Sequence, residues 1–263
     1  AGSYMLLVNN GETGCSATTT TTVGNHTTPP TVVLAQSGLL TCVQNTVALD
    51  GSNSSQGPNY SATWTTAAGN IVSGQGTFAI VVNETGNYVL TVLNTQNGCT
   101  ETAQIQVQEN TSTPGALIIP APALHCNLPQ ITLLGSGATF GALTYAWTAS
   151  ANGNIVNGSS SPTPLIDEPG SYTLLVTNPA NGCSSSTTIA VSIIPDPIFD
   201  PSLTQPNCIV QKGSIDFGTI IGGQSPFRYS INGGQSQDTQ TSYNQLEPAA
   251  YPLLVSDANG CTA

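Results

Sequence analysis

One short segment recurs four times along the chain and limits its fold more than any other feature. It consists of a tyrosine-led apolar stretch, a turn and a Gly-Cys pair. The four copies occupy residues 2–15, 86–99, 170–183 and 249–261. Self-similarity at a fixed period indicates a tandem array of structural units. The chain is therefore predicted to be a string of similar small modules.

The cysteines give the length of the period. The four Gly-Cys cysteines are 84, 84 and 78 residues apart, and the three others are 84 and 82 apart. Each period thus holds one early and one late cysteine, which predicts one disulfide inside each module. Cys15 is left over, and its partner is expected before residue 1. The expected pairs are Cys42–Cys99, Cys126–Cys183 and Cys208–Cys261.

Large aromatic residues recur at two positions of the period. One lies 21 or 22 residues after each early cysteine, and the other opens each strand that leads to a late cysteine. A single large aromatic at a fixed place in a small module indicates the centre of its core. Stacking on a carbohydrate is the alternative interpretation for the first position. The predicted core aromatics are Trp64, Trp147, Tyr229, Tyr88, Tyr172 and Tyr251.

The residues on either side of each Gly-Cys pair predict a β-hairpin. Tyr88, Leu90 and Val92 alternate with more polar residues, as do Ile105 and Val107 beyond the cysteine. Alternation with period two is typical of a half-buried strand. Asn-Gly lies between the two strands in three of the copies, and it favours a type I′ turn with two residues at positive φ.

A glutamate precedes the tyrosine by four residues in three copies, at Glu84, Glu168 and Glu247. Two interpretations remain open: a hydrogen bond shared with the turn, or a solvated loop charge.

The expected fold is all-β, with tandem Ig-like antiparallel β-sandwiches arranged as beads on a string. Short strands with turn signals every 8–12 residues fit such modules, and no helical period persists. The expected domains are a C-terminal hairpin of a truncated module (residues 1–24), two Ig-like modules (29–109 and 114–194), and a third module without its last strand (198–263). Residues 32–34 are expected to form an early strand of the first whole module.

The charge composition argues against several classes of partner. The chain has two Lys or Arg residues against 13 Asp or Glu residues, a net charge of −11. Binding to nucleic acid requires clustered basic side chains, which Lys212 and Arg228 cannot supply. No apolar run is long enough for direct membrane insertion. Disulfides persist in oxidising surroundings, so an extracellular or cell-surface location is expected.

No catalytic or cofactor site is expected. His26 and His125 are the two histidines, and they form no recognisable dyad or zinc motif. Calcium bound by the acidic loops at residues 50–53, 167–168 and 196–200 is the alternative to ordinary turn chemistry. Glycosylation sequons occur at Asn25, Asn53, Asn59, Asn83, Asn110 and Asn157.

The pattern Trp…Glu-x-Gly-x-Tyr-x-Leu-x-Val…Asn-Gly-Cys resembles the tandem Ig-like and PKD-like modules of giant bacterial surface proteins. The third module contains Phe-Arg-Tyr-Ser-Ile-Asn-Gly-Gly at residues 227–234 and ends with Leu-Val-Ser-Asp-Ala-Asn-Gly-Cys. It is similar to the repeats of Bacteroidota gliding adhesins and related secreted filaments. The resemblance covers nearly the whole chain. It implies a string of β-sandwiches exported to the cell surface, and it carries over no active site.

These observations predict a non-catalytic structural or adhesive protein, a segment of a surface stalk or filament. The expected partners are neighbouring copies or modules of the same protein, with surface glycans as a second class. The alternative function is a carbohydrate-binding accessory segment of a secreted enzyme. That alternative requires exposed aromatics, for which Tyr60 and Tyr243 are the candidates.

Overall fold

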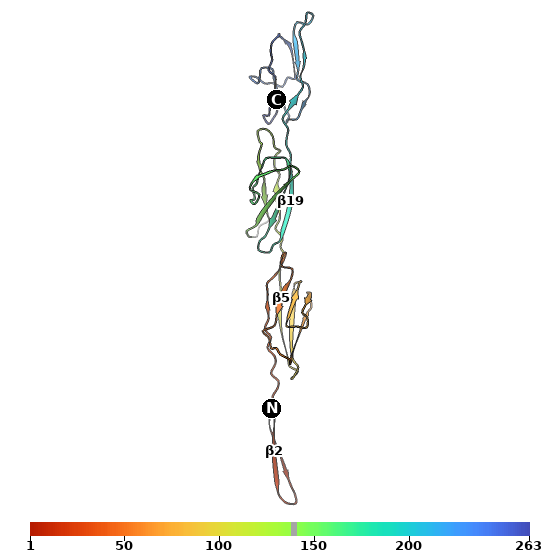
Figure 1. Ribbon diagram of the computed structural model, residues 1–263, viewed down its shortest axis with the longest axis vertical. Helices are drawn as coiled ribbons and strands as arrows, with labels where there is room; N and C mark the ends of the chain where they lie inside the picture. The colour runs from red at the N-terminus through yellow and green to blue at the C-terminus, as the bar shows by residue number, and fades with distance from the viewer. Residues whose placement is uncertain (138–140) are drawn as a thin grey trace. The chain divides into compact units, whose positions relative to one another are not determined.

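The fold was analysed in a computed structural model that describes residues 1–137 and 141–263. These residues form 26 β-strands, which confirms the predicted all-β class (Figure 1). Within them, no helix is long and apolar enough to cross a bilayer. They divide into two compact units, Ala1–Ser112 and Thr113–Ala263.

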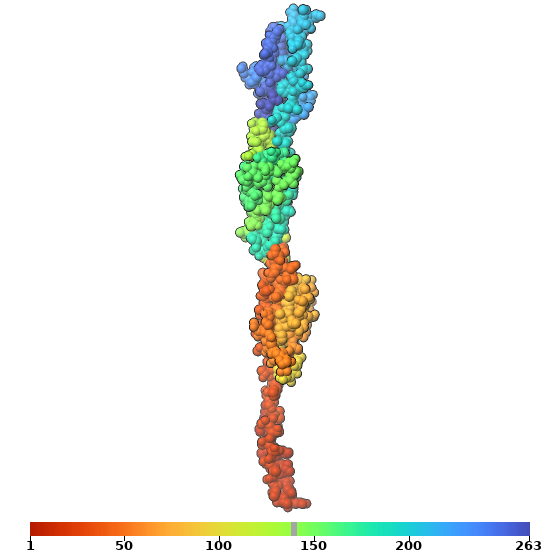
Figure 2. All heavy atoms as spheres, viewed as in Figure 1, coloured from red at the N-terminus to blue at the C-terminus, as the bar shows by residue number. Residues whose placement is uncertain are grey.

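The first unit begins with a two-stranded hairpin. Strands β1 (Gly2–Asn9) and β2 (Ser16–Val23) pair antiparallel from Gly2↔Val23 to Asn9↔Ser16. All of their residues are exposed; the hairpin is drawn in red in Figure 2.

The rest of the first unit is an Ig-like β-sandwich. One sheet has the order β3-β5-β8-β7 and the other β10-β9-β6, and the core fills the space between them. Alternation places Trp64, Tyr88, Leu90 and Val92 in that core with no exposed surface. A short parallel pair, β4 with β11, joins the beginning of the module to its end. The strands are β3 (Ala35–Gln36), β4 (Leu40–Thr41), β5 (Val47–Asp50), β6 (Tyr60–Thr66), β7 (Ile71–Ser73), β8 (Ala79–Val82), β9 (Gly86–Asn94), β10 (Thr100–Val107) and β11 (Glu109–Asn110).

The second module, at the start of the second unit, repeats this plan. Its central sheet has the order β15-β18-β19, in which Trp147 lies opposite Leu174, as Trp64 lies opposite Leu90 in the first module. The strands are β12 (Leu117–Ile119), β13 (Ile131–Thr132), β14 (Leu134–Ser136), β15 (Thr144–Ser150), β16 (Ile155–Asn157), β17 (Leu165–Ile166), β18 (Gly170–Thr177) and β19 (Ser184–Val191).

The third module has a smaller core, built around the ring of Phe217. That ring lies 5.3 Å from Phe199, 5.1 Å from Tyr229 and 6.1 Å from Tyr243, measured between centroids. The strands are β20 (Ile198–Phe199), β21 (Ser202–Thr204), β22 (Gly213–Asp216), β23 (Ile220–Ile221), β24 (Arg228–Ser230), β25 (Ser242–Leu246) and β26 (Leu254–Ser256).

Two local predictions were wrong. Residues 32–34 form no strand, because the amide of Val33 binds the side-chain oxygen of Ser54 (3.0 Å) instead of a neighbouring strand. The Asn-Gly turn is not type I′, because only Gly98 has positive φ (+74°) and Asn97 does not. The loop has five residues, and the amide of Gly98 binds the carbonyl of Asn94 (2.8 Å).

Candidate functional site

The candidate functional site is a covalent joint between the second and third modules. Cys126 of the second module forms a disulfide with Cys261 of the third, with Cα atoms 5.7 Å apart and a sequence separation of 135 residues. Both modules belong to the second compact unit. The bond therefore links two modules that have separate hydrophobic cores.

A polar contact accompanies the disulfide. The side-chain amide of Asn127 donates a hydrogen bond to the backbone carbonyl of Asn259 (2.8 Å). Gly260, between Asn259 and Cys261, has φ of +81°, and a Cβ at this position would lie 2.8 Å from the Asn127 amide nitrogen. Glycine therefore permits both the turn and the close approach of the two modules.

The buried carboxylate of Asp257 holds the turn that presents Cys261. One carboxylate oxygen accepts hydrogen bonds from the amides of Asn259 (2.9 Å) and Cys261 (2.8 Å), and the other accepts one from the amide of Gln224 (2.9 Å). Hydrogen bonds to an ionised acceptor are stronger than neutral ones. The Asn-Gly-Cys turn is thus fixed to the body of the third module.

The loop that carries Cys126 is anchored at the opposite end of the second module from Cys183. Leu124 exchanges backbone hydrogen bonds with Ser192 (2.9 Å) and Ile194 (2.8 Å), just after β19 ends, whereas Cys183 directly precedes β19. About ten residues of strand separate these points, roughly 30 Å. A disulfide requires Cα atoms closer than about 7 Å. The predicted pair Cys126–Cys183 is therefore wrong.

The other two predicted pairs are wrong as well. In the first module, Leu40–Thr41 pairs with Glu109–Asn110, which places Cys42 at the far end of β10 from Cys99. Cys99 is a free thiol. Cys208 is also free, because Cys126 occupies its expected partner Cys261. The disulfides thus do not follow the expected scheme of one within each module. Cys42 and Cys183 are likewise disulfide-bonded, and Cys15 is an exposed thiol.

His125 lies beside the joint. Its ring nitrogen and the sulfur atoms of Cys126 and Cys261 lie within 4.8 Å of one another. The thiolate is the form of cysteine that ligates a metal. The oxidised pair therefore offers no thiolate, and the site is chemically a disulfide.

Five of the six core aromatics named from the sequence are buried: Trp64, Trp147, Tyr88, Tyr172 and Tyr229. Tyr251 is half-buried. The indole N–H of Trp147 donates a hydrogen bond to the carbonyl of Ser161 (2.9 Å).

The tyrosine hydroxyls explain why a glutamate position recurs four residues before each of three tyrosines. The hydroxyls of Tyr88 and Tyr251 each donate to the backbone carbonyl of the glutamate four residues earlier, at 2.9 Å, and Tyr172 does so at 2.5 Å. The three glutamate side chains are exposed. The shared hydrogen bond therefore exists, but it uses the backbone, and the carboxylates are surface charges. This tyrosine corner is typical of Ig-like sandwiches.

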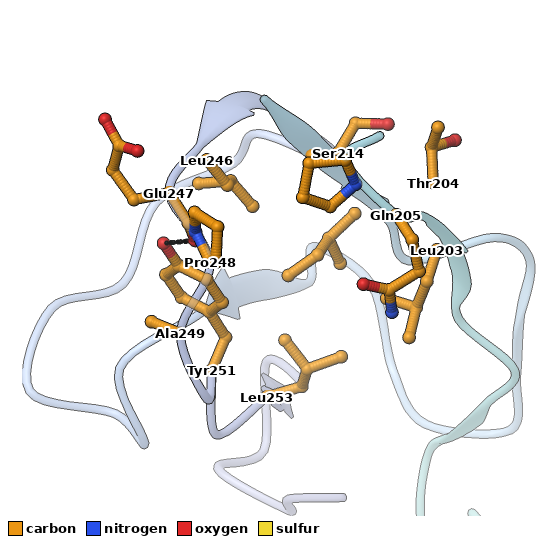
Figure 3. A pocket seen from close by; sticks show the side chains of 13 residues that line it. Leu203, Thr204, Gln205, Ser214, Leu246, Glu247, Pro248, Ala249, Tyr251 and Leu253 are labelled. Carbon is orange, nitrogen blue, oxygen red and sulfur yellow. Dashed lines mark hydrogen bonds between the residues drawn. The ribbon is translucent and has the colours of Figure 1, made fainter. Parts of the chain in front are cut away.

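A groove of about 270 Å³ opens the core of the third module (Figure 3). Leu203, Leu246, Tyr251 and Leu253 line it, and Tyr251 and Leu253 are half-exposed. The equivalent residues of the second module, Tyr172 and Leu174, are fully buried. The third module thus leaves part of its core face uncovered, which the position of Tyr251 in the sequence could not reveal.

The two aromatics named for carbohydrate stacking are engaged with the protein. Tyr60 packs against the core of the first module. The ring of Tyr243 contacts Phe217, and its hydroxyl donates a hydrogen bond to a carboxylate oxygen of Asp238 (2.6 Å). Burial and this bond raise the pKa of Tyr243 to about 12. Neither ring forms part of an exposed aromatic row.

Two of the three acidic loops named for calcium use a carboxylate oxygen in a hydrogen bond within the protein. Asp50 accepts a hydrogen bond from the amide of Ser52 (2.8 Å), and bonding to Ser52 lowers the pKa of Asp50. Asp167 accepts one from the side-chain amide of Asn154 (2.8 Å). The Asp50 bond is ordinary turn chemistry, whereas the Asp167 bond joins two side chains that are 13 residues apart in the sequence.

The chain matches no family model and no curated protein. Among solved structures it is similar to the I-band fragment I67–I69 of titin, with 13% identity and a TM-score of 0.39 over 89% of this chain and 97% of that one. It is also similar to the N-terminal eight Ig domains of DSCAM, with 13% identity and a TM-score of 0.41 over 100% of this chain and 45% of that one. Three N-terminal domains of the Hoc capsid protein of bacteriophage RB49 give 13% identity and a TM-score of 0.38, over 89% and 85% of the two chains. Scores this low assign no function to the chain.

Proposed function

We propose that the chain is a non-catalytic structural or adhesive repeat protein, a segment of an extracellular stalk or filament. The single observation that carries this proposal is the disulfide between Cys126 and Cys261. A bond inside one module would stabilise that module alone, whereas this bond holds two neighbouring modules together. Building a continuous assembly from small units is the task that such a bond serves.

The chemistry of the joint supports an oxidising location. The joint is a formed disulfide in which Cys126 is exposed and Cys261 is buried. Reducing compartments keep cysteine thiols reduced, whereas stable structural disulfides are typical of secreted and surface proteins. The resemblance of the repeat to modules of bacterial surface proteins favours the same location.

The surface composition supports lateral or end-to-end packing. Only 6% of the residues are charged, and the net charge is −11. Few charged side chains therefore lie on the surfaces that would meet, and the net charge is the repulsion that remains between copies. Neighbouring copies or modules of the same protein are therefore the proposed partners.

Immunogold electron microscopy of the producing cells tests the proposal. Antibodies against the purified chain are expected to label stalks or fibres outside the cell. A parallel labelling of intact and permeabilised cells provides the control, because surface epitopes react equally in both. Label confined to the cytoplasm, or catalytic turnover by the purified chain, would contradict the proposal.

A further inference from the structure

Two equivalent tryptophans, Trp64 of the first module and Trp147 of the second, differ in their hydrogen bonds. The backbone amide of Trp147 donates to the carbonyl of Ser159 (2.8 Å), and its indole N–H donates to the carbonyl of Ser161 (2.9 Å). Both acceptors belong to the turn that follows β16. One short peptide segment thus satisfies both donors of Trp147.

Trp64 has neither bond. Its indole nitrogen is buried and has no hydrogen-bond partner among the described residues. The amide of Thr95 donates to the carbonyl of Asn59 (2.8 Å), so the hydrogen-bonded pairs with β9 fall on the odd-numbered residues of this segment. Trp64 therefore belongs to a non-bonded pair. Its backbone amide faces away from β9, toward the free edge of the sheet.

A cavity of about 330 Å³ opens beside Trp64. Its wall carries no charged side chain, and besides Trp64 it consists of Thr65, Thr66, Asn70, Ile71 and Gln75. Gln75 precedes Ser159 by one period of 84 residues. It is exposed, and its side chain makes no hydrogen bond in the part of the chain that the structure describes. Moving that side chain aside therefore breaks no bond.

The two donors of Trp64 call for two acceptors. Trp64 has no exposed surface, so solvent does not satisfy them. Buried donors without a partner are rare in folded proteins, because each lowers the stability of the fold. In an extended peptide the carbonyls of residues i and i+2 point to the same side. Ser159 and Ser161 have this spacing.

We propose that the first module binds an uncharged, extended peptide segment of a partner protein at the free edge of β6. Two backbone carbonyls of the peptide, two residues apart, accept hydrogen bonds from the backbone amide and the indole N–H of Trp64. Addition of a strand to an exposed sheet edge is a recurring mode of peptide recognition. The peptide is a second kind of partner, beyond the neighbouring copies of the proposed function.

The chemistry of the site selects the peptide. The first unit contains no Lys or Arg that could pair with an acidic side chain. The cavity wall has no carboxylate that could pair with a basic one, and an unpaired charge is costly to bury. The segment that holds the same place in the second module, Gly-Ser-Ser-Ser-Pro at residues 158–162, is itself uncharged and small.

The ¹⁵N-labelled full chain tests the proposal, because its sequence contains only two tryptophans and so gives two indole cross-peaks in a ¹H–¹⁵N spectrum. The probe is a synthetic peptide with the sequence of residues 156–164. We expect the Trp64 peak to shift saturably as the peptide is added. Its indole proton should exchange with solvent up to about tenfold more slowly, since it gains a hydrogen bond. The Trp147 peak should stay in place, and glucose or sodium sulfate should move neither.

Matched variants locate the site. Gln75→Ala leaves the cavity open and should retain binding, whereas Gln75→Phe fills it and should abolish the shift. Ser159→Phe is the equivalent change in the second module and should leave the response of Trp64 intact. Gln75 and Ser159 are both exposed, so unchanged circular dichroism confirms that each variant is folded.

Four outcomes would overturn the inference: no saturable shift with the peptide, equal shifts of both peaks, a shift with glucose or sulfate instead, or binding that survives in Gln75→Phe. A Trp64 indole proton that is as protected as that of Trp147 before any peptide is added would also overturn it, because the donor would then already have a partner. The surface labelling of cells tests the proposed function separately, and neither result decides the other.

Discussion

The hydroxyl of Tyr88 donates a hydrogen bond to the backbone carbonyl of Glu84, 2.9 Å away, and accepts one from the amide of Asn70 at 3.0 Å. A single buried side chain thus ties together two turns of the first sandwich. Tyr172 repeats the arrangement with Glu168 and Asn154 in the second.

Tyr88→Phe should destabilise the first module. The substitution removes both the donor to the Glu84 carbonyl and the acceptor of the Asn70 amide, a loss of about 1–3 kcal/mol in the free energy of unfolding for the two hydrogen bonds. Urea unfolding of the full chain measures it. Tyr251→Phe is the control, because Tyr251 is half-exposed and donates only one bond, to Glu247. Equal losses in the two variants would contradict this account.

Stability should fall at alkaline pH. Burial raises the pKa of Tyr88 and Tyr172 above the usual value of 10.0. A raised pKa means that the folded state holds its protons more tightly, so this stability is complete below pH 10 and is lost as the pH rises above it. The melting temperature should therefore decline above about pH 10. The Tyr88→Phe, Tyr172→Phe double variant should show a shallower decline, and an identical slope would refute the assignment.

Gly86→Ala should be strongly destabilising. A Cβ at residue 86 would lie 1.9 Å from the carbonyl oxygen of Ala68, a clash with backbone that a rotamer change cannot relieve. Overpacking of this kind costs about 1–3 kcal/mol or more. Gly76→Ala in the same module is the matched control, because nothing lies within 4 Å of its Cβ. Thermal melts of both variants provide the comparison.

Loss of the joint should destabilise the third module. Cys126→Ser removes the constraint on the unfolded chain, worth up to about 5 kcal/mol for a loop of this size on the chain-entropy model. Cys208→Ser removes a free thiol and should leave the melting temperature unchanged. Mass spectrometry of the unreduced parent chain should recover a Cys126–Cys261 peptide. Recovery of a Cys126–Cys183 peptide instead would contradict the disulfide between the second and third modules.

Local patterns in the sequence predicted the strands around Tyr88 and Tyr172, because alternation of apolar residues determines which face is buried. The cysteine pairing depends on a non-local contact, the pairing of Leu40–Thr41 with Glu109–Asn110, which places Cys42 at the far end of the module from Cys99. Cysteine spacing contains no information about that distance. The recurring glutamate was visible in the sequence. That its backbone carbonyl accepts the hydrogen bond of the tyrosine hydroxyl was not, because a pattern of side chains does not show which atom accepts a bond.

The disulfide between Cys126 and Cys261 also determines how the chain responds to pulling. Tension applied at the two ends of the chain passes directly from one sulfur to the other and bypasses the segment between them. A separation of 135 residues corresponds to roughly 450 Å of fully extended chain. That length cannot extend while the bond is intact, so the redox state of this cysteine pair limits the extensibility of the two modules.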